Sequence, residues 1–201
     1  EKTNLSATKI ANSINLIADK AVFRNYINRS YSICDGIGPQ RVGLSIDPPI
    51  AKVNKSIFLR PANMEDCDIL YDWQCYPGTR RFFNNSNIPS RSEHVYWMEQ
   101  CLRNREMYLN IIELGNINVG MLLIHTDVCQ KFYTVNILIG PEYQNKGIAG
   151  AALVAIKRLF PNEKFRAQIH SENIASKKIF KNAGFKKIKT NWYEYAPIKN
   201  A

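Results

Sequence analysis

The sequence contains no apolar run that approaches the roughly 20 residues needed to cross a bilayer, and no secretion signal is visible. Its five cysteines are scattered, with no C-x-x-C pair and no histidine at metal-ligand spacing from them. An odd, unpatterned cysteine set suits a reducing cytosol. We therefore expect a cytoplasmic protein with no metal site and no membrane association.

Acidic residues are few, with 17 Asp and Glu against 27 Lys and Arg, and the formal net charge is +10. Most of the excess lies in residues 51–201, where 21 basic residues face 13 acidic ones. A basic balance favours an anionic partner such as a nucleotide or a polyphosphate cofactor. A solvated, lysine-rich surface is the alternative explanation. No nucleic-acid-binding motif is present, so we expect no nucleic-acid partner.

At 201 residues and 45% apolar content, the chain is long enough for one ordinary domain and a small appendage. Residues 1–46 are predicted to be helical, with a short helix that Pro39 could start. Residues 47–55 contain two prolines and are predicted to be a linker. The order predicted beyond it is that of an α/β domain: strand 57–62, helices 63–75 and 90–104, hairpin 107–127, strand 132–140 buried on both faces, helix 148–160, strand 164–170, helix 173–184 and a last strand region 185–198.

Neither of the common glycine-rich phosphate loops is present, since G-K-[ST] and G-x-G-x-x-G are both absent. A different glycine turn, "QNKGIAG" (residues 144–150), lies between a predicted strand and a predicted helix. The first backbone N–H groups of a helix are unpaired and can bind phosphate. Gln144, Asn145 and Lys146 would add polar side chains, Gly147 an unusual backbone angle, and Ala149 and Gly150 room beside Ile148. An ordinary loop whose glycines serve packing is the alternative.

This turn and a second segment together resemble the GNAT superfamily of N-acetyltransferases, over roughly residues 56–195. "LRPANMEDCDILYDWQ" and "SEHVYWMEQCL" also resemble a subgroup of that family, which includes acetyltransferases of amino sugars and of protein N-termini. The matching residues of the two motifs are Gln144, Gly147, Ala149 or Gly150, Asn173, Ser176, Phe180, Gly184 and Phe185.

The resemblance implies a GNAT fold over residues 56–201, with a mixed central sheet, splayed parallel strands and flanking helices. It implies acetyl-CoA as cosubstrate, with the pyrophosphate on residues 144–150 and the pantetheine along Ile137, Leu138 and Ile139. Asn173, Ser176 and Phe180 would also contact the cofactor. The acceptor amine would attack the thioester directly, without a metal.

Two positions depart from the family pattern. The family often has Tyr as general acid where this chain has Phe180, which has no proton to give, so we expect Ser176 or a water to act instead. The family often has a Glu on the strand before the glycine turn. In this chain the predicted strand 132–140 has only Thr134 and Asn136 in its place, and neither is a base. We keep Asn136 as a candidate catalytic residue and favour His94 over Glu113 as the base. A packing role for Ser176 and a backbone-bonded His94 are the alternatives.

The acceptor pocket of such enzymes is expected in the segments before the centre of the sheet. Trp73, Arg80, His94 and Trp97 are the candidate acceptor-binding residues, together with the "FFNNSN" loop. An arginine there would suit the phosphate of a nucleotide sugar. For the two tryptophans, a place in the aromatic core is the alternative.

Residues 1–46 resemble the C-terminal end of nucleotide-sugar hydrolases and glycosyltransferases, such as the hydrolase of the pseudaminic acid pathway. The resemblance rests on the pattern D-G-x-G-x-x-R-V, formed by Asp35, Gly36, Gly38, Arg41 and Val42. It implies a truncated upstream domain fused to the acetyltransferase, and a nucleotide-linked amino sugar as acceptor in surface-polysaccharide biosynthesis. A protein N-terminus or another small amine as acceptor, and a weakly catalytic acyl-CoA-binding module, stay open as alternatives.

Overall fold

The computed structural model describes Ser6, residues 37–126 and residues 131–197. By its internal contacts the chain divides into two units, residues 1–42 and residues 43–201. Helix α3 (Gly38–Ile46) is the short helix that Pro39 predicts. The helix expected before residue 37, and with it most of the hydrolase-like segment, lies outside the described residues. The sheet and its covering helices belong to the second unit.

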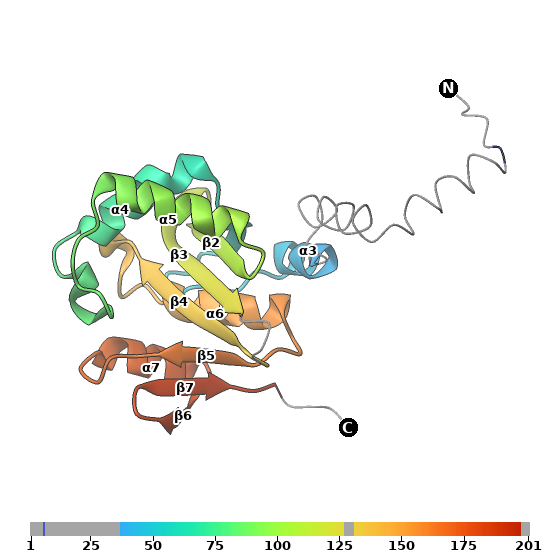
Figure 1. Cartoon of the computed structure of the whole chain (residues 1–201). Helices are drawn as coiled ribbons and strands as arrows, with labels where there is room; N and C mark the ends of the chain where they lie inside the picture. Colours follow the sequence, from blue (N-terminus) through green and yellow to red (C-terminus); the bar gives the residue numbers. More distant parts are fainter. Residues whose placement is uncertain (1–5, 7–36, 127–130, 198–201) are drawn as a thin grey trace. The chain divides into compact units, whose positions relative to one another are not determined.

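The second unit is built on a seven-stranded sheet with the order β1-β2-β3-β4-β5-β7-β6 (Figure 1). Among the described strands, β4 and β5 form the one parallel pair, which confirms the expected mixed α/β sheet. The single strand region expected at the end is a hairpin instead, because Asn191 takes a left-handed turn with φ of 61°. The strands are β1 (Ile57–Pro61), β2 (Met107–Leu114), β3 (Ile117–Thr126), β4 (Tyr133–Ile139), β5 (Phe165–Gln168), β6 (Lys186–Lys189) and β7 (Trp192–Tyr195).

Helices cover the sheet on both sides. Asn63 and Ser90 each form a capping box, so the helical segments that begin at Met64 and Arg91 start where helices 63–75 and 90–104 are predicted. Helices α4 and α5 pack together on one face of the sheet, while α6 crosses the other face and α7 packs beside it (Figure 1). The helical segments are η1 (Met64–Asp66), α4 (Cys67–Cys75), η2 (Thr79–Phe82), α5 (Arg91–Arg103), η3 (Pro141–Tyr143), α6 (Ile148–Leu159) and α7 (Ile174–Asn182).

The core between the sheet and helices α4 and α5 is formed by Trp73, Met98, Ile111 and Leu138 among others. Strand β4 was expected to be buried on both faces, and this is wrong. Asn136 is exposed and only Val135 and Leu138 of this strand are buried. The reason is that β4 loses its neighbour on one side halfway along its length, so its second half faces a cavity.

Residues 47–55, the predicted linker, are held by backbone hydrogen bonds. The Ala51 N–H donates to the Lys55 carbonyl at 2.9 Å, and the Ile57 N–H donates to the Pro49 carbonyl at 2.8 Å. A β-bridge joins Ile50 to Ser56, and Ala51 is buried. This closed segment, residues 50–56, is called the bridge turn below, and it leads directly into β1.

An ion cluster around the buried Asp66 ties the start of α4 to the first two strands. Arg60 holds both oxygens of Asp66, at 2.8 and 2.6 Å, and its Nε donates to Glu113 at 2.9 Å. The Asn63 N–H donates to the same Asp66 carboxylate at 2.9 Å. Burial alone would raise the pKa of Asp66, but the hydrogen bonds from Arg60 and Asn63 outweigh it and hold this pKa below its ordinary value.

We predict that Asp66→Asn destabilises the protein by about 2 to 3 kcal/mol near neutral pH, because it removes the buried carboxylate and leaves the half-buried Arg60 without its bidentate partner. Since the folded-state pKa of Asp66 is lowered, its contribution is complete above the ordinary value of 3.8 and is lost as the pH falls through the lower folded value. Urea unfolding at several pH values measures both effects.

Asp68→Asn is the matched control, because Asp68 lies two residues further on, in the first turn of α4, with an exposed side chain paired to Arg91. We expect that change to cost less than about 1 kcal/mol. Equal stability of the two variants would contradict the structural role given to Asp66.

Candidate active site

The parallel strands β4 and β5 separate soon after they meet. They pair at Tyr133 with Phe165 and at Thr134 with Arg166, and the described part of the chain shows no pairing between them beyond that point. The Gly140 N–H donates to the Val119 carbonyl on β3 at 2.9 Å. Because backbone groups alternate along a strand, Leu138 also faces β3, while Ile137 and Ile139 direct theirs to the open edge. Of the three residues expected to pair with a ligand here, two therefore direct backbone groups to the open edge, where the Ile139 carbonyl also accepts a hydrogen bond from the Gln144 amide at 3.5 Å.

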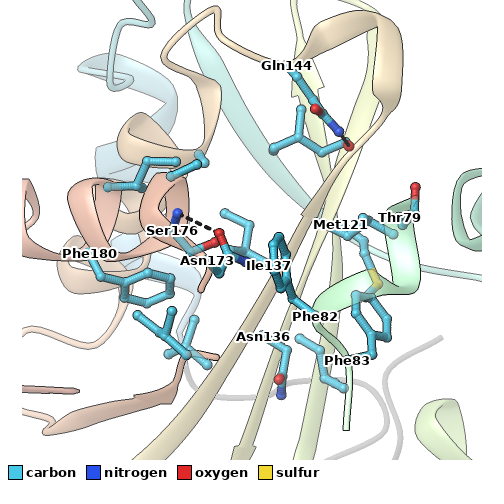
Figure 2. Close-up of a pocket in the computed structure, with 18 of the residues that line it drawn as sticks. Thr79, Phe82, Phe83, Met121, Asn136, Ile137, Gln144, Asn173, Ser176 and Phe180 are labelled. Atoms are coloured by element: carbon cyan, nitrogen blue, oxygen red, sulfur yellow. Dashed lines mark hydrogen bonds between the residues drawn. The ribbon is translucent and has the colours of Figure 1, made fainter. Parts of the chain in front are cut away.

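A cavity of about 1770 Å³ opens beside this edge. Residues of α7 and residues of η2 lie on either side of β4 within it (Figure 2). Most of the site residues predicted from the sequence are brought together there. They are Arg80, His94, Trp97, Asn136, Ile137, Leu138, Ile139, Gln144, Asn145, Gly147, Ile148, Ala149, Gly150, Asn173, Ser176 and Phe180.

Residues 144–150, called the phosphate turn below, form the N-terminal end of α6. Gly147 has a φ of 79° and no side chain caps the helix. The first helical bond runs from the Ala151 N–H to the Gly147 carbonyl at 3.2 Å, which leaves the N–H groups of residues 148–150 without helical partners. A Cβ built on Gly150 would meet no atom within 4 Å. Unpaired amides beside open space fit a phosphate group.

The polar side chains of the phosphate turn are placed differently from one another. The Gln144 amide lies 3.5 Å from the Ile139 carbonyl at the end of β4, and its residue lines the cavity. The Lys146 ammonium donates to the Glu142 carbonyl at 2.8 Å and lies over the Tyr143 ring, and Lys146 is not among the described lining residues. The sequence predicts that the side chain of Lys146 contacts the cofactor. In the structure this side chain points away from the cavity.

Helix α7 directs Ser176 and Phe180, which lie one helical turn apart, into the cavity. Asn173 caps the helix by accepting a hydrogen bond from the Ser176 N–H at 3.0 Å, as its N-cap pattern predicts (Figure 2). Phe180 is buried and packs edge-on against Phe185 at 4.9 Å between ring centroids. Gly184 ends the helix with a φ of 86°, as predicted.

His94 lies at the inner wall of the cavity with only 1% of its surface exposed. Its Nε2 lies 3.0 Å from the Cys67 carbonyl, so Nε2–H donates and Nδ1 is the free acceptor. Burial lowers the pKa of His94, and the imidazole is neutral at pH 7. A neutral imidazole with a free nitrogen is compatible with a base that works through water. Glu113, the alternative base, is bonded to Arg60 and is not a described lining residue.

The two candidate tryptophans differ in position. Trp97 lines the cavity beside His94, with 5.4 Å between the ring centroids. Trp73 is 4% exposed and belongs to the hydrophobic core. It packs so closely on Gly140 that a Cβ there would lie 2.7 Å from the indole nitrogen. Trp73 therefore has the core position that the sequence left open, and it does not face an acceptor.

The segment around η2 reaches across the cavity to the end of β5. The Asn84 side chain donates to Gln168 at 3.4 Å, and the rings of Phe82 and His170 lie 5.5 Å apart. Sequence reasoning missed Gln168 and His170. Their place at the carboxyl end of a parallel strand, where ligands often bind in α/β sheets, is the signal that could have found them.

Arg80 is held in a fixed orientation within this segment. Its two terminal nitrogens donate to the Gln74 side chain at 2.7 Å and to the Asn85 carbonyl at 2.8 Å, and its guanidinium lies over the Phe83 ring. A guanidinium has five N–H donors, so each terminal nitrogen keeps one more for a ligand.

Lys52 of the bridge turn also lines the cavity, and no motif marks it in the sequence. Its stem lies against Gly147, where a Cβ would be 2.5 Å from the Lys52 Cγ. The described residues contain no group of three or more His, Cys, Asp or Glu side chains able to hold a metal ion. None of the helices in residues 37–126 and 131–197 is long and apolar enough to span a membrane.

Comparison with known proteins shows which family this chain resembles. The model of the acetyltransferase (GNAT) domain matches residues 56–186. A domain from Methanocaldococcus jannaschii has a similar structure, with 25% identity, a TM-score of 0.64, and coverage of 71% of this chain and 99% of the other. No curated protein matches the sequence.

Two structures that hold coenzyme A have the same fold at lower identity. The ribosomal L7/L12 alpha-N-protein acetyltransferase is 14% identical, with a TM-score of 0.63 and coverage of 72% of this chain and 96% of the other. An aminoglycoside acetyltransferase is 15% identical, with a TM-score of 0.61 and coverage of 70% and 95%.

We predict that Gly150→Asp lowers the affinity for acetyl-CoA more than tenfold, because a carboxylate would occupy the open space and repel phosphate. The fold should keep its stability, since an acidic residue is favourable in the first turn of a helix. Calorimetric titration gives the affinity, and thermal unfolding gives the stability.

Gly150→Asn is the control for this experiment, because it adds nearly the same volume without the charge. The Asn variant should bind more tightly than the Asp variant. Wild-type affinity in Gly150→Asp would show that phosphate does not bind at this turn.

Proposed function

The chain belongs to the GNAT acetyltransferase family, and we propose that it acetylates the amine of a nucleotide-linked amino sugar in surface-polysaccharide biosynthesis. The family assignment makes it an N-acetyltransferase that uses acetyl-CoA, as in the family members solved with coenzyme A. What we add concerns the acceptor, the pathway and the residues that act on each substrate.

The residues present fit acetyl-CoA, which supplies an activated thioester for direct attack by an amine. The unpaired amides of the phosphate turn suit the pyrophosphate. The backbone groups that Ile137 and Ile139 direct to the open edge suit an amide-bearing pantetheine arm, in the way that an exposed strand edge binds an extended chain. A strand N–H at that edge would polarise the thioester carbonyl as negative charge develops on its oxygen.

The charge of the cavity is the observation that carries the acceptor proposal. Among its described lining residues, only Glu93 has a carboxylate, and one oxygen of that carboxylate already accepts two hydrogen bonds from Ser90. Four basic residues line it, Lys52, Arg80, Arg158 and Lys178, and among these Arg158 is ion-paired with Asp47 at 3.1 Å. A positive site favours an anionic acceptor and disfavours a polycation such as an aminoglycoside.

The neutral polar residues of the cavity support a sugar acceptor. Amide side chains both donate and accept hydrogen bonds, which suits the hydroxyl groups of a sugar. Those that line the cavity on the acceptor side are Asn84, Asn85, Asn87, Asn136 and Gln168. Arg80 lies among them, and its planar fork suits a phosphate of the nucleotide.

Ser176 and His94 are the residues that we propose transfer protons. Ser176 lies one helical turn before Phe180, and we propose that its hydroxyl, or a water bound to it, protonates the leaving thiolate. His94 would accept the proton of the acceptor ammonium at Nδ1 through water. Asn136 would orient the acceptor, because its exposed side chain extends from β4 into the cavity.

An acceptor screen tests the proposal. We expect acetyl transfer to a UDP-linked amino sugar, and much weaker transfer to kanamycin or to peptides with free N-termini. Arg80→Gln should raise KM for the nucleotide-linked acceptor about tenfold or more, the cost of one charge-assisted hydrogen bond, with kcat little changed.

Arg81→Gln is the matched control, since Arg81 is exposed and stacks on Phe82. Preference for peptides would favour the N-terminal acetyltransferase alternative. Tight acetyl-CoA binding without turnover on any amine would favour the acyl-CoA-binding module.

Replacing Ser176 by Ala tests the general acid. We expect kcat to fall about tenfold to a hundredfold and the alkaline side of its pH profile to change, with acetyl-CoA affinity kept, because a positioned acid contributes roughly this much or more. Steady-state kinetics across pH, with a calorimetric check of binding, give these values. An unchanged kcat and pH profile would leave Ser176 as a small packing residue.

A further inference from the structure

The bridge turn places a lysine directly against the phosphate turn, although the two are about 95 residues apart in the sequence. A Cβ on Gly147 would lie 2.5 Å from Lys52 Cγ, 2.9 Å from its backbone nitrogen and 3.0 Å from its Cβ. Only glycine permits this approach, so the backbone of the phosphate turn and the stem of Lys52 are in immediate contact.

The position of Lys52 is fixed by the folding of its own turn. Besides the two hydrogen bonds of the bridge turn given above, the Asn54 N–H donates to the Ala51 carbonyl at 3.0 Å. Ala51, the neighbour of Lys52, is 3% exposed, and Asn54 takes a left-handed conformation with φ of 55°. The stem of Lys52 is therefore anchored at its base while its residue remains exposed at the cavity.

The lysine of the phosphate turn itself is used elsewhere. Lys146 donates to the Glu142 carbonyl at 2.8 Å and covers the Tyr143 ring at 5.1 Å. Lys52, in contrast, makes no ion pair with any residue in the described ranges. Lys52 is therefore the lysine that lines the cavity at this turn, and it lies outside residues 56–186, the region matched by the family model.

We propose that Lys52 is the cationic phosphate ligand of this acetyltransferase, binding the phosphates of coenzyme A beside the amides of the phosphate turn. This rests on the cofactor site described above. An ammonium on a flexible stem neutralises phosphate charge as a point charge, whereas the amides supply directed hydrogen bonds. The segment before β1 is then part of the cofactor site.

Calorimetric titration of the full chain with acetyl-CoA tests this. We expect Lys52→Gln to weaken binding about tenfold, the effect of losing one charge-assisted hydrogen bond, and Lys52→Arg to keep most of the affinity because it keeps the charge. The loss should shrink at high salt, since screening already weakens the charge interaction in the wild type. Titration with 3′-dephospho-CoA shows which phosphate Lys52 binds. If Lys52 binds the 3′-phosphate, wild type and Lys52→Gln should bind this ligand equally well; if it binds the pyrophosphate, the difference in affinity should remain.

Lys55→Gln is the matched control, a lysine of the same bridge turn whose residue does not line the cavity. It should bind acetyl-CoA like the wild type. Unchanged affinity in Lys52→Gln, or a loss in Lys146→Gln in its place, would overturn the proposal while leaving the cofactor site intact. No binding to the wild type would overturn the cofactor site itself, and the role of Lys52 with it.

Discussion

The separation of β4 from β5 after two paired residues is the constraint on which the site depends. Had the two strands stayed paired, the backbone groups of Ile137 and Ile139 would be used within the sheet. The separation leaves those groups without a strand partner, opens the cavity beside them, and exposes Asn136 on a strand whose sequence predicts full burial. The polar backbone at this edge is therefore available to an extended ligand.

Two rigid supports hold the walls of the cavity on either side of this edge. On the acceptor side, the ion cluster of Arg60, Asp66 and Glu113 fixes the start of α4 to the sheet. His94 then joins α5 to α4 through the Cys67 carbonyl, and Gln74 at the end of α4 holds Arg80. On the cofactor side, the bridge turn packs against Gly147. The residues of both supports lie in predicted strands, helices and a linker, and the sequence does not predict that they contact one another.

The fold alone does not choose an acceptor, because similar folds are found in an acetyltransferase of a ribosomal protein and in an aminoglycoside acetyltransferase. Here four basic residues, of which Arg158 is ion-paired with Asp47, and a single carboxylate are among the described lining residues. This balance is the basis for the anionic acceptor proposed above. Phe180 has no proton to give, which is why the proposed acid is Ser176 or a water.

The sequence by itself determined most of the helices and strands along the chain, the helix starts at Asn63, Ser90 and Asn173, and the turn at residues 144–150. These follow from local patterns: hydrophobic spacing, capping side chains and glycines at left-handed positions. Only the tertiary structure decided that Trp73 is core, that Lys146 turns away, that Leu138 pairs with β3, and that Lys52 reaches the phosphate turn. Each of these depends on contacts between segments far apart in the chain, and a local pattern carries no record of which neighbour a side chain will meet.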